Sequence, residues 1–413
     1  MNIQISKNTV ISYIYLSIIV IAGLSTILRP AINSKITLFR VLLPFLILFF
    51  IAIKPKKGVH FLLILLLLLV YSIFISLFIS RFETFSFIFF FYYSVVIFFY
   101  FFSEELIKTV TVIRTYRFLK NLFKVLIILG YLQYFFDGIY FNTQDRLPAV
   151  NVFFWNENEY SSVLAVFIPL FFLKEKSSLK YFWIFLSLFL LIHNDAKLAI
   201  ISNILFFGGY IVLKFKLFKL KYIGIFSLFI ILSCILFFGR DYRIQGTYTI
   251  DIFLSGLYNH IISQETFPHI GTFNARSNAI ILGIKEFINS GFLGIGPGNS
   301  LPMMKEIVIP GTEKYTALSM HNFIMQVITE IGILGISFLL FIYFRVKKAI
   351  KRNIIFSSNI IFLYYASTII SISLLSGPWS NYFYLFIFYF SIYFFESNIS
   401  TIENKNTISV REV

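Results

Sequence analysis

The stretch SMHNFIMQVITEIGILG, residues 319–335, opens a long apolar run that continues to residue 344. His321 lies at its threshold, and Glu330 follows nine residues later. At about 1.5 Å of rise per helical residue, Glu330 lies roughly 13 Å deeper than His321. In a bilayer core about 30 Å thick this depth is close to the midplane, where a charge is costly. The position of Glu330 therefore requires a specific structural or chemical reason.

The composition is typical of a membrane protein. Apolar residues make up 58% of the 413 residues, and charged residues only 13%, whereas a soluble domain carries about a quarter charged residues. The single cysteine, Cys234, lies inside an apolar run, which excludes a disulfide within the chain. The five histidines are scattered, no cluster has metal-ligand spacing, and no cleavable signal peptide is recognised. We expect neither a metal nor another cofactor.

Apolar runs between charged clusters predict an all-α polytopic membrane protein with about twelve transmembrane helices. The whole chain, 1–413, is expected to form one integral membrane domain. The predicted spans lie near 10–28, 38–53, 61–80, 84–102, 122–136, 160–173, 179–193, 197–213, 222–238, 323–344, 354–375 and 382–395.

The basic residues predict the orientation of these spans. With the N-terminus inside, about two thirds of the 35 Lys and Arg residues fall in inner segments, as the positive-inside rule expects. Both termini are then cytoplasmic. A nucleic-acid partner is not implied by the net charge of +16, because the basic residues are dispersed over short loops.

This topology places most of the polar sequence on the outer face. One long loop, 239–322, lies there, together with the polar island 144–160 and the short turn 193–197. Loops of this length in a compact chain usually have a function. Arg240 and Arg243 begin the long loop, where they either attract phosphate or serve as ordinary interface anchors.

Within the long loop, NARSNAIILGIKEFINSGFLGIGPGNS, residues 274–300, predicts an amphipathic helix followed by a glycine turn. Its apolar face comprises Ile280, Ile284, Phe287 and Ile288, and such a helix can lie in the membrane interface. Arg276 falls in its first turn, where a guanidinium and a helix N-terminus together favour an anion. The glycines of the turn, which include Gly294, Gly296 and Gly298, permit close approach to a ligand or to another helix, although a plain turn also explains them.

At this point the sequence resembles the O-antigen polymerase and O-antigen ligase family of bacterial polysaccharide assembly. The resemblance rests on His-Asn, nine residues, Gly332, two residues and Gly335, together with the upstream arginine and its glycine turn. FFWNENEYSSVLAVFIPLFFL, residues 153–173, is similar to the asparagine-containing loop of that family. The similar region covers about 150–345. Where the family commonly has Ser-Arg-Gly, this chain has Asp195-Ala196-Lys197, which retains the charge but loses the bidentate fork of arginine.

The resemblance implies a metal-independent glycosyltransferase in the bacterial cytoplasmic (inner) membrane, with its active site extracytoplasmic. Its substrate would be an oligosaccharide linked to undecaprenyl diphosphate, and its product O-antigen, capsular or related cell-envelope polysaccharide. A chain-length regulator and a flippase of the same pathway are possible partners. His321 would be the catalytic base, and Arg276, Lys197 and Arg243 would hold the diphosphate.

The other candidate residues have less specific interpretations. Asn156, Glu157 and Asn158 either bind sugar hydroxyls or belong to a solvated loop. Glu330 either orients the site through hydrogen bonds or pairs structurally with a buried Lys or Arg, and we favour the structural role. The remaining structural or support residues are Asn322, Gly332, Gly335, Gly296 and Gly298. At Gly332 and Gly335 we expect close helix packing rather than substrate contact.

Two other functions compete with the transferase. A flippase for lipid-linked oligosaccharides would need charged residues facing a central path in several spans, whereas Glu330 is essentially the only ionisable residue at mid-membrane. A non-catalytic scaffold of a polysaccharide pathway would have no need for His321. Polymerase and ligase share the donor chemistry, so the sequence leaves both open and favours the polymerase.

Overall fold

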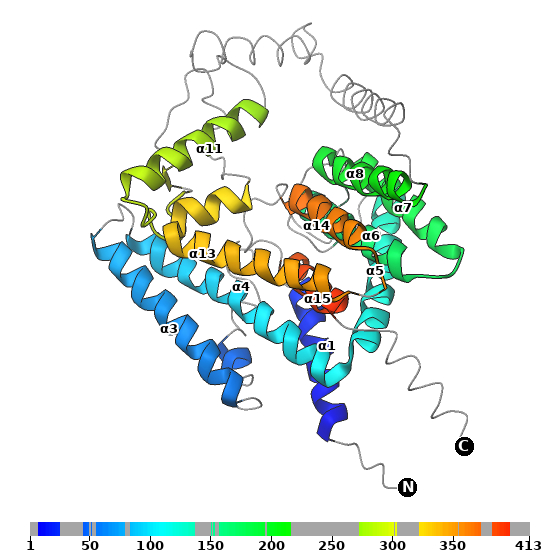
Figure 1. The fold of residues 1–413 in the computed structure, drawn as a ribbon, viewed down its shortest axis with the longest axis horizontal. Coiled ribbons are helices and arrows are strands. Elements are labelled where there is room, and N and C mark those ends of the chain that lie inside the picture. The colour runs from blue at the N-terminus through cyan, green and yellow to red at the C-terminus, as the bar shows by residue number, and fades with distance from the viewer. Residues whose placement is uncertain are drawn as a thin grey trace, which may run out of the picture.

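The computed structural model describes residues 7–24, 44–48, 51, 55–78, 83–136, 150, 152, 157–194, 196–215, 272–300, 302–303, 322–353, 355–372 and 382–396. Within these ranges it contains no strand, and its long helices number eleven (Figure 1). They are α1 (Lys7–Leu24), α3 (Pro55–Phe78), α4 (Glu83–Val110), α5 (Val112–Phe135), α6 (Glu157–Lys174), α7 (Leu179–His193), α8 (Lys197–Lys214), α11 (Thr272–Asn289), α13 (Phe323–Arg352), α14 (Ser358–Ile372) and α15 (Tyr382–Glu396).

The prediction of an all-helical chain is confirmed for the described residues. Ten of the predicted apolar runs are helical along most of their length. The runs at 38–53 and 222–238 lie largely or wholly outside the described residues, apart from the helical residues 44–48 and 51. By length and composition, two of the described helices, α5 and α13, are able to cross a membrane.

Several helices continue past their apolar runs into basic sequence. The segment from Val112 to Lys120 was expected to be loop, but it forms the first turns of α5. Arg and Lys are good helix formers, and here they alternate with one buried face of α5. The side chains of that face are Val112, Thr115, Tyr116, Leu119, Phe123, Leu126, Ile127 and Gly130. Hydrophobicity alone therefore gave the start of this helix ten residues too late.

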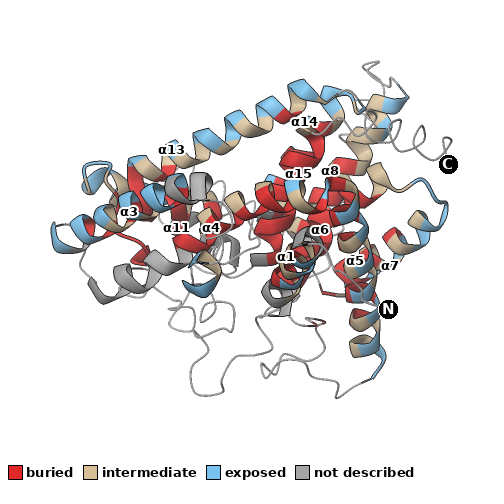
Figure 2. Ribbon diagram, turned by 90° about the horizontal axis from the view of Figure 1, so that it is seen from below, coloured by how far each residue is buried: buried red, intermediate tan, exposed pale blue. Residues whose placement is uncertain are grey.

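The centre of the core is α15, which packs against α1, α4, α6 and α13. Almost every side chain from Phe383 to Phe395 is buried, and Figure 2 shows the buried residues concentrated on this helix and its neighbours. Phe386 packs against Phe99 and Phe102 with ring centroids 6.3 and 6.1 Å apart. Because large aromatic side chains bury much apolar area, the phenylalanine-rich composition supplies a core in which the helices interlock.

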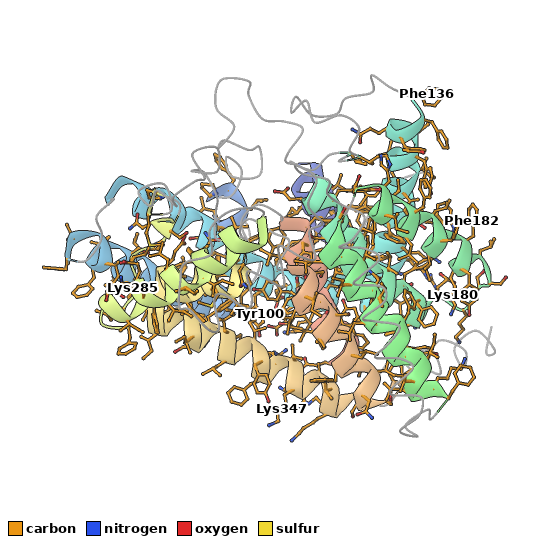
Figure 3. All side chains as sticks on the ribbon, turned by 90° about the horizontal axis from the view of Figure 1, so that it is seen from above. Tyr100, Phe136, Lys180, Phe182, Lys285 and Lys347 are labelled. Carbon is orange, nitrogen blue, oxygen red and sulfur yellow. The ribbon has the colours of Figure 1, made fainter. Side chains whose placement is uncertain are left out.

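Charged side chains pair where helix ends meet. Arg345 of α13 forms an ion pair of 2.9 Å with Glu396 at the end of α15, and Lys120 of α5 forms one of 2.9 Å with Glu175 after α6. Both pairs join segments that the charge bias assigns to the inner face. Lys347, in the same basic segment as Arg345, points away from the bundle, whereas Tyr100 lies within it (Figure 3).

The predicted amphipathic helix is α11, followed by a turn over residues 290–299. It packs against α13, and its buried positions include the small residues Ala279 and Gly283. Ile284 and Ile288 of the predicted apolar face are 43% and 54% exposed. The helix and its glycine turn are therefore confirmed, but these isoleucines do not pack on the described protein.

Candidate functional site

The candidate site is built around a break in α13. Gly332 has φ 59° and ψ −135°, which interrupts the helix after its first nine residues. In Figure 1, α13 changes direction sharply between its yellow first part and its orange second part. A break frees backbone groups that a straight helix would pair internally. In a buried position these groups need other partners.

The glycine turn after α11 supplies most of those partners. The backbone N–H of Ile295 donates to the carbonyl of Thr329 at 2.9 Å, and that of Gly296 donates to the carbonyl of Glu330 at 3.0 Å. In the opposite direction, the N–H of Ile333 donates to the carbonyl of Phe292 at 2.9 Å. The turn thus replaces the hydrogen bonds that α13 loses at its break.

Tyr71 of α3 satisfies the next freed carbonyl. Its hydroxyl donates to the carbonyl oxygen of Ile331 at 2.8 Å and also lies against that of Leu293. The same hydroxyl therefore contacts both the turn and the break, so that α3 covers the junction between them.

Close packing explains the glycines at this junction. A Cβ on Gly294 would lie 2.6 Å from the backbone nitrogen of Gly332, and a Cβ on Gly335 would lie 2.6 Å from the carbonyl oxygen of Val327. A Cβ on Gly332 would overlap the carbonyl groups of Phe292 and Leu293. The glycine turn was expected to approach a ligand or another helix, or to be a plain turn. The structure shows that Gly294 approaches another helix, α13. The expected packing role of Gly332 and Gly335 is confirmed as well.

The Glu330 carboxylate lies in the middle of this junction and is fully buried. One oxygen accepts from the Tyr93 hydroxyl at 2.9 Å and from the backbone N–H of Gly298 at 2.8 Å. The other accepts from the Gln326 amide at 2.9 Å and from the Ser300 hydroxyl. Every donor that the described residues bring to this carboxylate is uncharged. The favoured interpretation, a structural pairing with a buried Lys or Arg, finds no such partner among the described residues, which instead give Glu330 the hydrogen bonds of the other interpretation.

Gly296 and Gly298 contribute through their backbones. Both have positive φ, 96° and 82°, a conformation that only glycine adopts readily. The N–H of Gly298 binds the Glu330 side chain, and that of Gly296 binds the Glu330 carbonyl. Both N–H groups are thus used within the protein, so neither is available to cradle a phosphate.

Asn322 forms the N-cap of α13. Its side-chain oxygen accepts the N–H of Met325 at 3.1 Å, an arrangement that stabilises a helix start. His321, the residue before the cap, lies outside the described residues. The expected support role of Asn322 is confirmed, whereas the catalytic role of His321 stays a prediction.

Arg276 is the fifth residue of α11, and only its backbone is described. Both α11 and the first part of α13 end at the glycine turn, and they pack against each other. From that junction Arg276 is about 20 Å back along α11, and Asn322 is about 15 Å back along α13, at 1.5 Å per residue. In Figure 1 the starts of both helices lie on the same side of the pair. The backbone positions of Arg276 and Asn322 are therefore at the same end.

A second polar cluster joins the other predicted outer segments. The Asn194 side chain accepts the N–H of Val150 at 2.9 Å and donates to the carbonyl of Val150 at 2.7 Å. It also donates to the Ser161 hydroxyl at 3.2 Å, and the N–H of Val152 donates to Gln133 at 2.8 Å. The island 144–160 and the turn 193–197, far apart in sequence, therefore meet at their described residues.

This cluster frames several candidate residues. Lys197 begins α8 directly after the turn, and Glu157 and Asn158 begin α6, although only the backbone of these three residues is described. Asn156 and Arg243 lie outside the described residues, as does most of the loop 239–322 apart from residues 272–300 and 302–303. Their proposed contacts with glycan and diphosphate stay predictions.

Sequence reasoning missed Tyr71, Tyr93, Gln326 and Asn194. The two tyrosines are in apolar runs that contain many aromatic residues, so nothing in the sequence distinguishes them. Gln326 carries a usable signal, because it precedes Glu330 by four residues and thus shares a helix face with it. Asn194 is part of the turn HNDAK, in which we considered only the charged residues.

Among the described residues, no three His, Cys, Asp or Glu side chains gather in a way that could hold a metal ion. Comparison with protein-family models, with characterised proteins and with solved structures finds no match to this chain.

Proposed function

We propose that the chain is a membrane glycosyltransferase that polymerises oligosaccharide repeats carried on undecaprenyl diphosphate. Its site would face outward from the bacterial inner membrane, and its termini would face the cytoplasm. The donor lipid stays in the bilayer during transfer, while the acceptor glycan reaches the site from water.

A membrane environment is supported by the surfaces of the described helices. Besides α5 and α13, six shorter apolar helices are present in the described part. On α3 the exposed side chains include Leu63, Leu67 and Leu77, which are 59%, 60% and 66% accessible. Exposed apolar surface of this extent is unfavourable in water and favourable in lipid.

The proposed arrangement of the spans is supported by contacts between loops that are assigned to the same side of the membrane. The ion pairs Lys120–Glu175 and Arg345–Glu396 each join two segments assigned to the inner side. The hydrogen bonds of Asn194 with Val150 join two segments assigned to the outer side. Each contact therefore joins two segments of the same assignment, in agreement with the spans counted between them, while the choice of the inner face rests on the charge bias.

The observation that carries the proposal is the joining of α11 to the break in α13. This joint holds the helix of Arg276 against the helix that begins directly after His321. An arginine and a histidine at the same end of a helix pair, near the outer face, suit a phosphate leaving group and a base.

The proposed chemistry needs only groups of the protein. His321 takes the proton of an acceptor hydroxyl, whose oxygen bonds to the anomeric carbon of the donor sugar. The bond from that carbon to the diphosphate oxygen breaks, and undecaprenyl diphosphate leaves with the electron pair. Arg276, together with Lys197 and Arg243, offsets the growing negative charge.

A ligase would use the same donor site but a different acceptor. In a polymerase the acceptor is another lipid-linked repeat, which suits any bacterial envelope. A ligase for lipid A core needs an outer membrane, for which the sequence provides no sign. Deletion of the gene should therefore leave single repeats, whereas long chains stranded on the lipid carrier would favour a ligase.

A transporter of lipid-linked oligosaccharides deserves comparison because broken helices and buried carboxylates occur in transporters. There the freed backbone carbonyls coordinate ions. Here the carbonyls of Thr329, Glu330 and Ile331 already accept hydrogen bonds from the turn and from Tyr71. This arrangement favours the transferase over the flippase.

The decisive experiment is His321→Ala, measured as polymer formation by membranes with matched protein levels. Loss of a general base should reduce the rate by about 10² to 10⁴. His260→Ala, in the same predicted loop, is the control and should retain activity. Near-normal polymer from His321→Ala would remove this histidine from the active site.

Arg276→Lys tests the diphosphate side of the proposal. It keeps the charge but removes the bidentate fork, so the ladder of chain lengths should weaken. Lys285→Arg is the matched control on the same helix, because Lys285 is exposed and projects from α11 (Figure 3). Equal activity of the two variants would argue against a diphosphate contact for Arg276.

A further inference from the structure

The hydrogen bonds of Glu330 form a balanced set. An ionised carboxylate has about four acceptor positions, and four donors occupy them here. One donor, the N–H of Gly298, belongs to the glycine turn, and a second, the hydroxyl of Ser300, directly follows it. A third comes from Tyr93 on α4, and the fourth from Gln326 on α13. One negative charge therefore joins three elements of the fold.

Gln326 is the adjustable member of this set. Its amide nitrogen donates to Glu330 and lies 3.3 Å from the Ser300 hydroxyl oxygen, to which it also donates. Its amide oxygen is buried and has no hydrogen-bond partner among the described residues. A reversal of this amide would present an acceptor to residue 330 in place of a donor. The pair 326/330 can thus hold its charge on either residue, provided that one of them is an acid and the other an amide.

The turn that this pair holds is also the C-terminal anchor of α11. The turn is held to α13 by the hydrogen bonds from Ile295 and Gly296 to the carbonyls of Thr329 and Glu330. If the turn leaves the break, these bonds are lost, and α11 is no longer anchored at its C-terminal end. The position of Arg276 relative to the start of α13 then changes. The Glu330 carboxylate lies at the junction and not at the start of α11 or of α13. Its effect on the positions of those two helix starts therefore acts through the glycine turn.

We propose that Glu330 and Gln326 are positioning residues for the transfer reaction: their single shared negative charge locks the glycine turn into the break of α13 and so fixes α11, which carries Arg276, relative to the start of α13. The positioning role rests on the proposed function. The lock itself does not, because it concerns only the turn and the helix.

Four proteins test the lock: wild type, Gln326→Glu, Glu330→Gln, and the double variant Gln326→Glu/Glu330→Gln. Gln326→Glu places two carboxylates side by side and removes a donor. Glu330→Gln removes the charge and leaves a neutral amide oxygen to accept from Tyr93 and Gly298. The double variant restores one acid and one amide, so that every donor again has an acceptor.

Hydrogen exchange of the turn, measured by mass spectrometry on the purified proteins in lipid nanodiscs, is the direct readout. Peptides covering residues 292–300 report the N–H groups of Ile295, Gly296 and Gly298. We expect Gln326→Glu to speed their exchange about tenfold or more, since two adjacent buried carboxylates repel each other and weaken the hold on the turn. Glu330→Gln, which removes the shared charge, should speed it about threefold or more because a neutral acceptor holds these donors less strongly, and the double variant should return to the wild-type rate.

Two exchange results would overturn the lock. One is a double variant that exchanges as fast as Gln326→Glu, which would mean that the charge cannot be shared. The other is a wild-type rate in Gln326→Glu. If Gln326→Glu fails to fold, recovery of a folded protein by the second substitution supports the lock, and failure to recover it overturns the lock.

Polymer formation by the same membranes tests the positioning role. We expect activity to fall in Gln326→Glu and to return in the double variant, with all four proteins present at equal levels. Activity that does not follow the exchange rate would overturn the positioning role while leaving the lock intact. Failure of the proposed function is recognised separately, by full activity of His321→Ala.

Discussion

The substitution Gly332→Ala addresses the feature on which the site depends. Gly332 has φ 59° and ψ −135°, and its neighbours across the junction are the backbone carbonyl groups of Phe292 and Leu293. A methyl group has no room there, and backbone atoms cannot rotate away as the end of a side chain can. The glycine turn must then move out of the break.

The expected cost has two parts. An alanine in this sparsely populated backbone region costs about 1–3 kcal/mol. Displacement of the turn also breaks the hydrogen bond from Ile333 to the carbonyl of Phe292 and the neighbouring ones from Ile295 and Gly296. Each of these hydrogen bonds contributes about 1 kcal/mol. A total of roughly 3–5 kcal/mol follows.

Gly291→Ala is the matched control. Gly291 has nearly the same φ, 63°, but nothing lies within 4 Å of a Cβ built there. Only the backbone cost of about 1–2 kcal/mol applies to it. Reversible unfolding of the purified proteins by SDS in mixed micelles should therefore separate the two variants by about 1–4 kcal/mol. Equal destabilisation would mean that the turn does not occupy the break.

Three further predictions concern the whole chain. Reporter fusions near residues 117 and 349 should give cytoplasmic signals, and a fusion near residue 260 an extracytoplasmic one; a cytoplasmic signal at 260 would place the site in the wrong compartment. Transfer activity in membranes should survive EDTA. Loss of activity with EDTA, followed by recovery with added divalent ion, would contradict the metal-independent chemistry. Burial by itself would raise the pKa of Glu175, but hydrogen bonds from Lys120 and from backbone N–H groups outweigh it and lower the pKa. This pair should therefore stabilise the fold above the ordinary carboxyl pKa and lose its effect as the pH falls through the lowered value, so acid titration should destabilise wild type more than Glu175→Gln.

The helical fold could be predicted because apolar runs and basic clusters alternate along the chain. The boundaries of α7, for example, coincide with the predicted run 179–193. The start of α5 was missed because a helix continues through any good helix former once one face is buried, and Arg114 and Arg117 lie on its opposite, exposed side.

The candidate site was predictable only in its local parts. The helix of Arg276, the glycine turn and the cap at Asn322 follow from spacings of a few residues. The partners of Glu330 do not, because Tyr93 and Ser300 come from elements that are distant in sequence. Sequence reasoning supplied a cation for a buried carboxylate, since that is its commonest partner, whereas the fold supplies four neutral donors instead.

The described contacts explain the spacing from Asn322 to Gly335, but they do not involve the preceding residue of the motif, His321. Asn322 caps the first part of α13, and Gly332 ends it after nine residues, which is the length that brings the break onto the glycine turn. Gly335 follows where the second part passes the carbonyl of Val327 too closely for a side chain. None of these contacts requires a histidine before the cap, because the cap uses only the side chain of Asn322. A histidine is nevertheless the one residue there whose charge changes near neutral pH. The described contacts account for the asparagine and the glycines, whereas His321 lies outside the described residues, so its substitution is the most informative test of the proposed function.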